Sequence, residues 1–405
     1  MLDTNESKTA RNVVLIGVGD AGCNVLNRVV TQWKTDTACF AINTDRRSLG
    51  RFAPEQAIEI GSSIAKGMGL GGNVPLGQRA ATLSHSEIEK IFWNVDIALI
   101  IAGLGGGTGS GATPVILEIA RDLGILTGVF CILPFEFEGK YRMSRAMIGL
   151  KPIQDLADSV FVLNNELLFN AYDPDTSILE AFARSEEELA PALFSIWQTL
   201  AHPGVINHDF SDIKSVLSDS TDRIFATGFG EGENRAKDAV NNLSVSPLLG
   251  KSLETGKFDA IVANIVSGPD LSLTEMNEAF NAVKKLAAKN AMVSVGAACS
   301  EHMSKKLLLS IFACEKQNIF GHEITPGIKQ ATGRIKRSSP AKKDPRQVSP
   351  VQTTLFEDAT APGKFKGIDP TYYKGVNIDI PTYKRKNLDI RRIEEPQTDY
   401  EPESL

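Results

Sequence analysis

Short apolar runs alternate with amphipathic stretches over the first two hundred residues of the chain. The stretches between the runs carry apolar residues at helical spacing, whereas the runs themselves are almost continuously apolar. Continuous apolar runs are typical of strands that are buried on both faces of a sheet. We interpret five runs as strands: 13–17, 38–43, 96–103, 125–133 and 158–164. The alternation predicts an α/β fold with a doubly wound parallel sheet.

A long helix and a second, smaller α/β unit are predicted after this domain. Residues 177–202 carry one apolar stripe at helical spacing, although Pro191 lies inside the stripe and would weaken a helix there. An amphipathic helix is predicted over 274–290. Strands of the second unit are predicted at 223–230, 257–268, 291–299 and 306–314.

The composition changes near Gly321. Nine of the 19 prolines lie between Pro326 and Pro402, and apolar periodicity is lost. Such a composition cannot bury enough apolar surface to order itself, so a disordered C-terminal tail is expected. The predicted organisation is a parallel-sheet domain, a central helix, a second domain, a flexible linker and a terminal peptide, at 12–176, 177–202, 203–320, 321–374 and 375–392.

Composition and charge exclude several classes of protein. The formal net charge of -6 argues against a general nucleic-acid binder. No apolar run is long enough to span a bilayer, and the polar N-terminus shows no secretory signal. The five cysteines are scattered without metal-ligand spacing, so we expect buried thiols in a reducing compartment and no metal site. A cytoplasmic protein is therefore expected.

Two glycine-rich loops each follow a predicted strand and precede a predicted helix. The first, GVGDAG at 17–22, fits the pattern G-x-G-x-x-G, and Asp45 stands 23 residues after Gly22. Alone, this pattern favours a dinucleotide-binding site and an NAD-dependent oxidoreductase. The second, GLGGGTGSG at 103–111, has six glycines in nine residues.

A second loop of this kind changes the interpretation of the first. Two strand–glycine–helix junctions in one sheet direct two sets of backbone N–H groups and two helix N-termini toward one region. Such a cradle is large enough for a chain of phosphates, and the hydroxyls of Thr108 and Ser110 add hydrogen-bond donors. The sequence therefore predicts a nucleotide site built from backbone amides, in which the glycines make room for phosphate oxygens.

The glycine loops and their neighbours resemble the tubulin/FtsZ family of GTPases. The similarity covers roughly residues 12–315. It is carried by GLGGGTGSG together with VLIGVGDAGCNVLNRV, FAINTDRRSL, IAKGMGLGGNVPLG, GILTGVFCILPFEFEGKYRM, GVINHDFSDI and GEGENRAKDA. The resemblance implies GTP and GDP as ligands, with Mg²⁺ bound to the phosphates.

The resemblance also implies the residues that contact the nucleotide. The loops expected around the phosphates contribute Gly19, Asp20, Ala21, Gly22, Asn24, Asn43, Thr44, Asp45, Gly69, Gly71, Gly72, Asn73, Gly103, Gly105, Gly106, Gly107, Thr108, Gly109 and Ser110. The 69–73 loop is expected toward the terminal phosphate. Asp20 departs from the family pattern, and a carboxylate there would repel phosphates unless it points outward or meets a cation.

Further residues are expected at the ribose and the base. Glu138 and Arg142 match positions that contact the ribose and phosphates, although their spacing also suits an ordinary helical salt bridge. Phe182 matches a stacking aromatic and Asn165 an amide that reads guanine. An acceptor carboxylate should face the N–H donors of guanine, and Glu187, with Glu186 beside it, stands where the family has an acid.

Hydrolysis is expected to use residues of the second unit. Asn207, Asp209 and Asp212, in NHDFSD, match the loop that completes the nucleotide site of the next copy in a head-to-tail filament. A carboxylate can orient the attacking water there. Without the resemblance, these residues would be interpreted as the start of a helix.

The predicted function is a GTPase that assembles into dynamic filaments of the bacterial division ring, at the division site beneath the membrane. The peptide DIPTYKRK, at 379–386, resembles a family peptide that binds membrane-tethering division proteins. The alternatives are a diverged relative with weak hydrolysis or a scaffolding role and, more remotely, an NAD-dependent oxidoreductase.

Overall fold

A computed structural model describes most of the two predicted folded units. It describes residues 12–33, 35, 37–173, 175–202, 204–206, 223–249 and 258–314, and the backbone of 372–373 and 376–377. The described residues up to Cys314 belong to one compact unit, and those from Tyr372 onward belong to a second unit. In the second unit, β11 (Tyr372–Tyr373) pairs with β12 (Val376–Asn377) in an antiparallel ladder.

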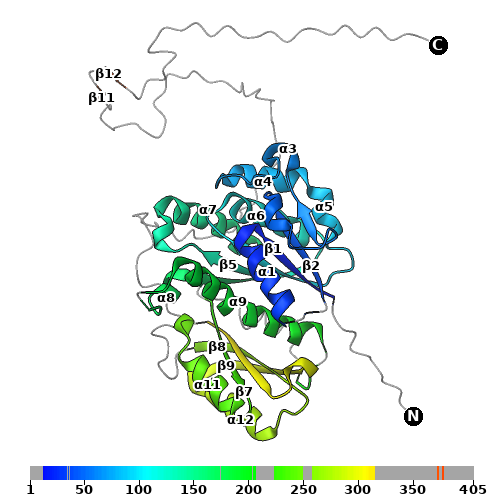
Figure 1. Ribbon diagram of the computed structural model, residues 1–405, viewed down its shortest axis with the longest axis vertical. Coiled ribbons are helices and arrows are strands. Elements are labelled where there is room, and N and C mark those ends of the chain that lie inside the picture. Colours follow the sequence, from blue (N-terminus) through cyan, green and yellow to red (C-terminus); the bar gives the residue numbers. More distant parts are fainter. Residues whose placement is uncertain are drawn as a thin grey trace, which may run out of the picture. The chain divides into compact units, whose positions relative to one another are not determined.

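The N-terminal part of the first unit is built on a six-stranded parallel sheet (Figure 1). Its strand order is β3-β2-β1-β4-β5-β6, and every neighbouring pair is parallel, which confirms the predicted doubly wound sheet. The strands are β1 (Val13–Val18), β2 (Ala38–Asn43), β3 (Ala57–Glu59), β4 (Ile97–Gly103), β5 (Leu126–Leu133) and β6 (Ser159–Asn164). Five of them match the predicted runs.

Each strand divides its apolar residues between two cores because successive side chains point to opposite faces. In β1, Leu15 belongs to the core beneath α1 (Gly19–Trp33) and α9 (Ile178–Ala201). Val14 and Ile16 belong to the core beneath α4 (Val74–Leu83), α6 (Gly107–Asp122) and α7 (Lys140–Leu156). Both faces of the sheet are therefore covered, which explains why its strands are continuously apolar. The helices of this part are α1 (Gly19–Trp33), α2 (Arg46–Leu49), α3 (Ser62–Ala65), α4 (Val74–Leu83), α5 (His85–Lys90), α6 (Gly107–Asp122), η1 (Glu136–Glu138), α7 (Lys140–Leu156) and α8 (Asn165–Phe169).

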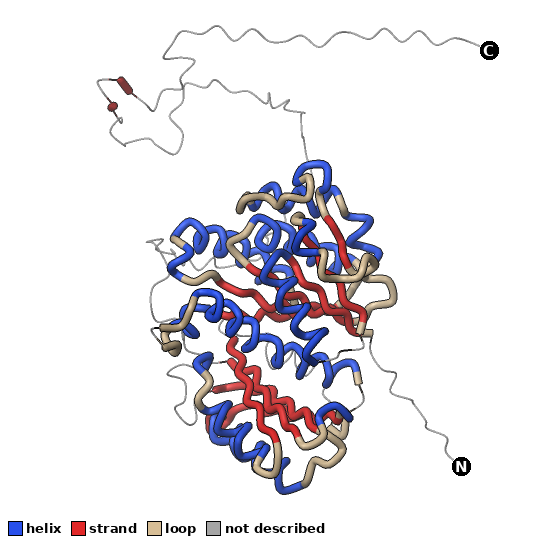
Figure 2. The backbone as a smooth tube through the Cα atoms, in the orientation of Figure 1, coloured by secondary structure: helices blue, strands red, loops and turns tan. Residues whose placement is uncertain are grey.

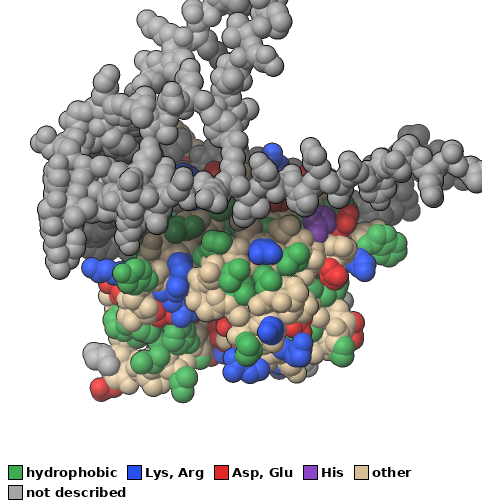
Figure 3. All heavy atoms as spheres, turned by 90° about the horizontal axis from the view of Figure 1, so that it is seen from above, with side chains coloured by type: hydrophobic (Ala, Val, Ile, Leu, Met, Phe, Trp, Pro, Cys, Tyr) green, Lys and Arg blue, Asp and Glu red, His purple; other side chains and the backbone are tan. Residues whose placement is uncertain are grey.

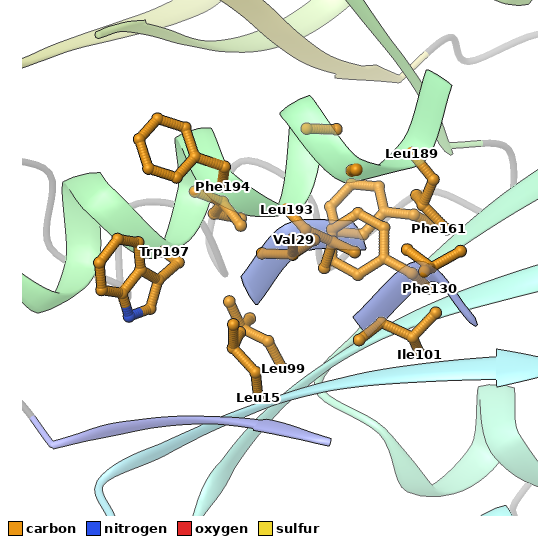
Figure 4. Close-up of a cluster of buried hydrophobic side chains, with 14 of the residues drawn as sticks. Leu15, Val29, Leu99, Ile101, Phe130, Phe161, Leu189, Leu193, Phe194 and Trp197 are labelled. Carbon is orange, nitrogen blue, oxygen red and sulfur yellow. The ribbon is translucent and has the colours of Figure 1, made fainter. Parts of the chain in front are cut away.

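The long helix α9 (Ile178–Ala201) connects this part to a second sheet (Figure 2). Its Leu193 and Trp197 pack toward Leu15 and Leu99 of the parallel sheet (Figure 4). The same core contains Phe312 of the second sheet, so α9 is buried between the two sheets. This burial on both sides compensates for Pro191, and the predicted helix runs through the proline without a break.

The second sheet has four strands in the order β7-β10-β8-β9, in which β10 is antiparallel to both neighbours and β8 is parallel to β9. The strands are β7 (Arg223–Glu231), β8 (Phe258–Ser267), β9 (Ala287–Cys299) and β10 (Lys306–Cys314), and α11 (Arg235–Ser244), α12 (Leu273–Leu286) and η3 (Glu301–Met303) accompany them. The helix predicted to run to residue 290 ends about one turn earlier, at Leu286. Ala287 already belongs to β9, where it pairs with Phe258 of β8.

Four of the five cysteines are buried as predicted, namely Cys23, Cys39, Cys131 and Cys314, whereas Cys299 is exposed. Within the described part of the chain, every helix is too short or too polar to cross a bilayer. Basic and acidic side chains are interspersed with hydrophobic ones over the described part of the face in Figure 3.

Candidate nucleotide-binding site

The two glycine loops lie side by side because β1 and β4 are neighbours in the sheet. Their register pairs Gly17 with Ile101 and Val18 with Ala102, so both strands end at the same edge. The strand order changes direction there, and ligands of open α/β sheets bind at such points. The helices α1 and α6 begin at Gly19 and Gly107, and no side chain caps the first turn of α6. Their N–H groups are therefore oriented toward one region, as an anion site requires.

The glycines of the second loop serve two purposes, only one of which was predicted. A Cβ on Gly106 would meet nothing within 4 Å, so this glycine leaves open space. A Cβ on Gly109 would lie 1.9 Å from the carbonyl oxygen of Gly103, and one on Gly111 would lie 2.2 Å from that of Val74. These two glycines allow backbone segments to pack closely, so the loop is only partly explained by room for phosphate.

A pocket with a volume of about 470 Å³ opens at this edge of the sheet. Most of the predicted nucleotide contacts line it: Gly19, Asp20, Ala21, Asn24, Asn43, Asp45, Gly69, Gly71, Gly72, Gly103, Gly105, Gly106, Gly107, Thr108, Gly109, Glu138, Arg142, Asn165, Phe182 and Glu186. The lining residues that the sequence did not predict are Met68, Leu70, Leu104, Ile132, Leu133, Pro134, Arg145 and Ser185.

Four predicted contact residues support the pocket from behind instead of lining it. Gly22 packs against the carbonyl of Ile101, where a Cβ would lie 2.3 Å from the oxygen. The Thr44 hydroxyl is hydrogen-bonded to that of Thr108 at 2.7 Å. The other two hold loop backbones: Asn73 accepts from the N–H of Leu76 at the start of α4, and Ser110 accepts from the N–H of Gly105.

Glu187 is the fifth predicted residue outside the pocket. Its carboxylate pairs with Arg28 at 3.1 Å and its side chain is 56% exposed. Glu186 lies one helical turn after Phe182, and both line the pocket. The Glu186 carboxylate accepts a hydrogen bond from the Asn24 amide at 2.9 Å. The acid that lines the pocket at this point of α9 is therefore Glu186, whereas the sequence favoured Glu187.

Asn165 and Phe182 lie at the same end of the pocket. Asn165 is 3% exposed, and its Oδ1 accepts a hydrogen bond from the Ser185 hydroxyl at 2.6 Å. Phe182 packs edge-on against Phe135 with a centroid distance of 5.3 Å, and 37% of its surface is exposed. An oriented amide and a partly exposed aromatic ring suit a planar heterocycle with polar edges.

The carboxylates in the pocket wall all have partners in their own chain. Asp20 accepts hydrogen bonds from the Asn43 amide at 2.8 Å and the Ser48 hydroxyl at 2.6 Å. Asp45 is hydrogen-bonded to the Arg47 guanidinium, which holds the pKa of that carboxyl below its usual range. The expected repulsion by Asp20 is thus offset in part, since both of its partners are donors.

Glu138 and Arg142 line the pocket and also pair with each other. Their N–O distance is 3.0 Å, and Glu138 accepts a further hydrogen bond from the N–H of Phe135 at 2.8 Å. The helical salt bridge and the pocket position, which the sequence left as alternatives, therefore coexist.

Two sets of predicted functional residues lie outside the described residues. The first comprises the predicted catalytic residues Asn207, Asp209 and Asp212, and the second is the peptide at 379–386. Among the described residues, no group of three or more His, Cys, Asp or Glu side chains is arranged to hold a metal ion.

Comparison with known proteins assigns the family. The GTPase-domain model of the tubulin/FtsZ family matches residues 12–173, and the C-terminal-domain model of the FtsZ family matches 223–316. The chain is 31% identical over 375 residues to the cell division protein FtsZ of Wigglesworthia glossinidia brevipalpis, covering 93% of this chain and 96% of that one. It is 30% identical over 390 residues to FtsZ of Pseudomonas aeruginosa, covering 93% and 97% of the two chains.

Solved structures agree with this assignment. An empty FtsZ dimer from M. jannaschii is similar with a TM-score of 0.67 and 32% identity, covering 76% of this chain and 89% of that one. The GDP-bound CetZ1 monomer from Haloferax volcanii shares the fold, with a TM-score of 0.63 and 20% identity over 76% and 95% of the two chains. The two family models decide between the predicted activities in favour of a GTPase over an oxidoreductase. The chain therefore belongs to the tubulin/FtsZ family and is an FtsZ-type GTPase of cell division.

Proposed function

We propose that the pocket at the ends of β1 and β4 binds GTP across its length, with the phosphates at the N-termini of α1 and α6 and the base near α9. The observation that carries this proposal is that one pocket combines the starts of α1 and α6, of which α6 has no side-chain cap, with the oriented polar groups near α9. Backbone N–H groups hold phosphate oxygens without a lysine, and the Phe182 ring provides a stacking face.

Guanine is favoured over adenine by the polar groups at the base end. The Glu186 carboxylate is an acceptor for the N1–H and N2–H donors of guanine, which adenine does not present on that edge. Because Ser185 occupies Oδ1 of Asn165, the Asn165 amide N–H groups remain for the guanine O6.

Hydrolysis is proposed to require a second copy of the chain. The pocket wall contributes four carboxylates, all hydrogen-bonded within their own chain: Asp20, Asp45, Glu138 and Glu186. A carboxylate whose pKa is lowered by a guanidinium, such as Asp45, is a poor base for water. We assign the orientation of the attacking water to Asp209 and Asp212 of the next copy in a head-to-tail filament, with Asn207 holding that water.

Mg²⁺ is proposed to bind mainly through the phosphates. Magnesium prefers oxygen ligands, retains several waters and uses one or two carboxylates beside substrate phosphates. Asp45 lies beside the 69–73 loop, since a Cβ on Gly69 would be 3.9 Å from its Oδ2, and it would hold the ion by exchanging its hydrogen bonds to Arg47 for the metal. When bound, the ion would neutralise charge on the phosphates.

The cellular role is proposed to be the division ring beneath the membrane. The peptide DIPTYKRK combines apolar residues with a basic cluster, a composition that suits docking of a short segment on a membrane-tethering partner.

Competition binding tests the nucleotide assignment. Labelled GTP bound to dilute protein should be displaced by unlabelled GTP and GDP, but not by ATP or NADH at a hundredfold higher concentration. Equal displacement by GTP and ATP would contradict the roles of Asn165 and Glu186. Displacement by NADH alone would contradict the guanine-nucleotide site itself.

A further inference from the structure

Arg145, in the second turn of α7, joins two loops of the pocket. Its Nε donates a hydrogen bond to the carbonyl oxygen of Gly105 at 3.0 Å. Its guanidinium also lies directly against Gly72, where an added Cβ would be 2.5 Å from Nη1 and 2.6 Å from Cζ. Gly72 has a φ of +81°, so the loop there takes a conformation that favours glycine and leaves space for the arginine.

The charge of Arg145 is available to a ligand. Arg142, one turn earlier on the same helix, is neutralised by Glu138 at 3.0 Å. Among the described residues, Arg145 forms no ion pair, and its only hydrogen bond there uses Nε. The two Nη groups therefore lie at the pocket wall without a carboxylate partner.

Arg145 lies at the end of the pocket where the phosphates are proposed to bind. The base end is formed by Asn165, Phe182 and Glu186 from α8 and α9. Arg145 instead contacts the loop that precedes α6 and the loop that precedes α4. These two loops pack together, since a Cβ on Gly107 would lie 3.0 Å from the carbonyl oxygen of Asn73. A phosphate chain that begins at the N-terminus of α6 and extends away from the base would meet the Nη groups of Arg145.

We propose that Arg145 binds the terminal phosphate of GTP and thereby couples the 69–73 loop to the presence of that phosphate. This inference rests on the proposed GTP site and identifies a residue of that site that distinguishes GTP from GDP. A guanidinium forms charge-assisted, paired hydrogen bonds with phosphate oxygens, which an ammonium reproduces only as a point charge. GDP lacks the terminal phosphate, so the contact distinguishes the two nucleotides by differential affinity.

Binding measurements on R145Q and R145K test this assignment. A non-hydrolysable GTP analogue and GDP would each be titrated into dilute protein. K151Q, which changes an exposed residue on the same helix, serves as the matched control. R145Q should lower the affinity for the GTP analogue at least tenfold, or about 1.4 kcal/mol. It should lower the affinity for GDP less than threefold. R145K should retain part of the preference, and K151Q should change neither affinity more than twofold.

Equal losses for the two nucleotides in R145Q would overturn the inference, because Arg145 would then only hold the two loops together. Unchanged affinity for both nucleotides would also overturn it. If R145Q does not fold, as judged by circular dichroism, the ratio of the two affinities in R145K decides in the same way. A wild-type protein that binds neither nucleotide would contradict the proposed function itself, whereas normal wild-type binding with an unchanged ratio in both variants contradicts only the role of Arg145.

Discussion

The neighbouring acids Glu186 and Glu187 provide a matched pair of variants for the base-reading proposal. Glu186 lines the pocket and is hydrogen-bonded to Asn24, whereas Glu187 lies outside it and pairs with Arg28. Glu186→Gln removes the charge, and its amide N–H₂ would face the N–H donors of guanine. Glu187→Gln makes the same chemical change one residue away, without touching the pocket.

The expected magnitude follows from the number of acceptors that Glu186 offers. One carboxylate oxygen accepts from Asn24 at 2.9 Å, and the other is 3.4 Å from Arg28, so each retains a lone pair for a ligand donor. Hydrogen bonds to charged groups contribute about 1.5–3 kcal/mol each. Since glutamine keeps one acceptor, we expect Glu186→Gln to weaken GTP binding by about 2–3 kcal/mol, which is a loss of affinity of roughly 30- to 150-fold.

Competition of labelled GTP by GTP, inosine triphosphate and ATP would measure this loss. Inosine triphosphate lacks the N2 amino group, so its penalty relative to GTP should shrink in Glu186→Gln. Glu187→Gln should bind GTP within about twofold of the wild type, because a surface ion pair contributes little. The reasoning would be refuted if Glu187→Gln lost GTP affinity and Glu186→Gln did not.

Three further outcomes are expected. Hydrogen bonding to Arg235 lowers the pKa of Glu275 to about 2, so unfolding measured against pH should show stability that is present above pH ~4.5 and is lost toward pH ~2. Glu275→Gln should remove this part of the acid dependence, which amounts to at most about 3 kcal/mol of unfolding free energy. If the variant keeps the wild-type dependence of stability on pH, this prediction is contradicted. Asp20→Asn should tighten GTP binding about threefold at low salt, with the gain shrinking as salt rises; weaker binding would mean that Asp20 holds a cation. Deleting 375–405 should leave nucleotide turnover intact and abolish localisation to division sites, and normal rings in the truncated strain would contradict the role of DIPTYKRK.

The fold could be predicted largely because burial on both faces leaves a strong pattern in the sequence. Five strands of the parallel sheet and the helix through Pro191 follow from that pattern. The strand β3 was missed because its three residues are only half-buried. The end of α12 was missed because Ala287 and its neighbours favour a helix, and only pairing with β8 makes them a strand.

The candidate site was predictable where a motif carried it. Helical spacing contained the signal for Glu186, which is four residues after Phe182 and therefore on the same face of α9. Arg145 left no such signal, because its position depends on a loop more than seventy residues earlier, where Gly72 leaves space for the guanidinium. Contacts between distant segments of this kind follow from the packing of α7 and not from a local pattern.

The central claim is that GTP hydrolysis needs two copies of the chain, and turnover measured against protein concentration tests it most directly. Asp212→Ala serves as the comparison, since it should bind GTP normally and assemble into filaments that persist. For the wild type, we predict that GTP turnover per molecule is near zero when dilute and rises above a threshold concentration at which light scattering also rises. Turnover per molecule that stays constant from dilute to concentrated solution would contradict the shared site.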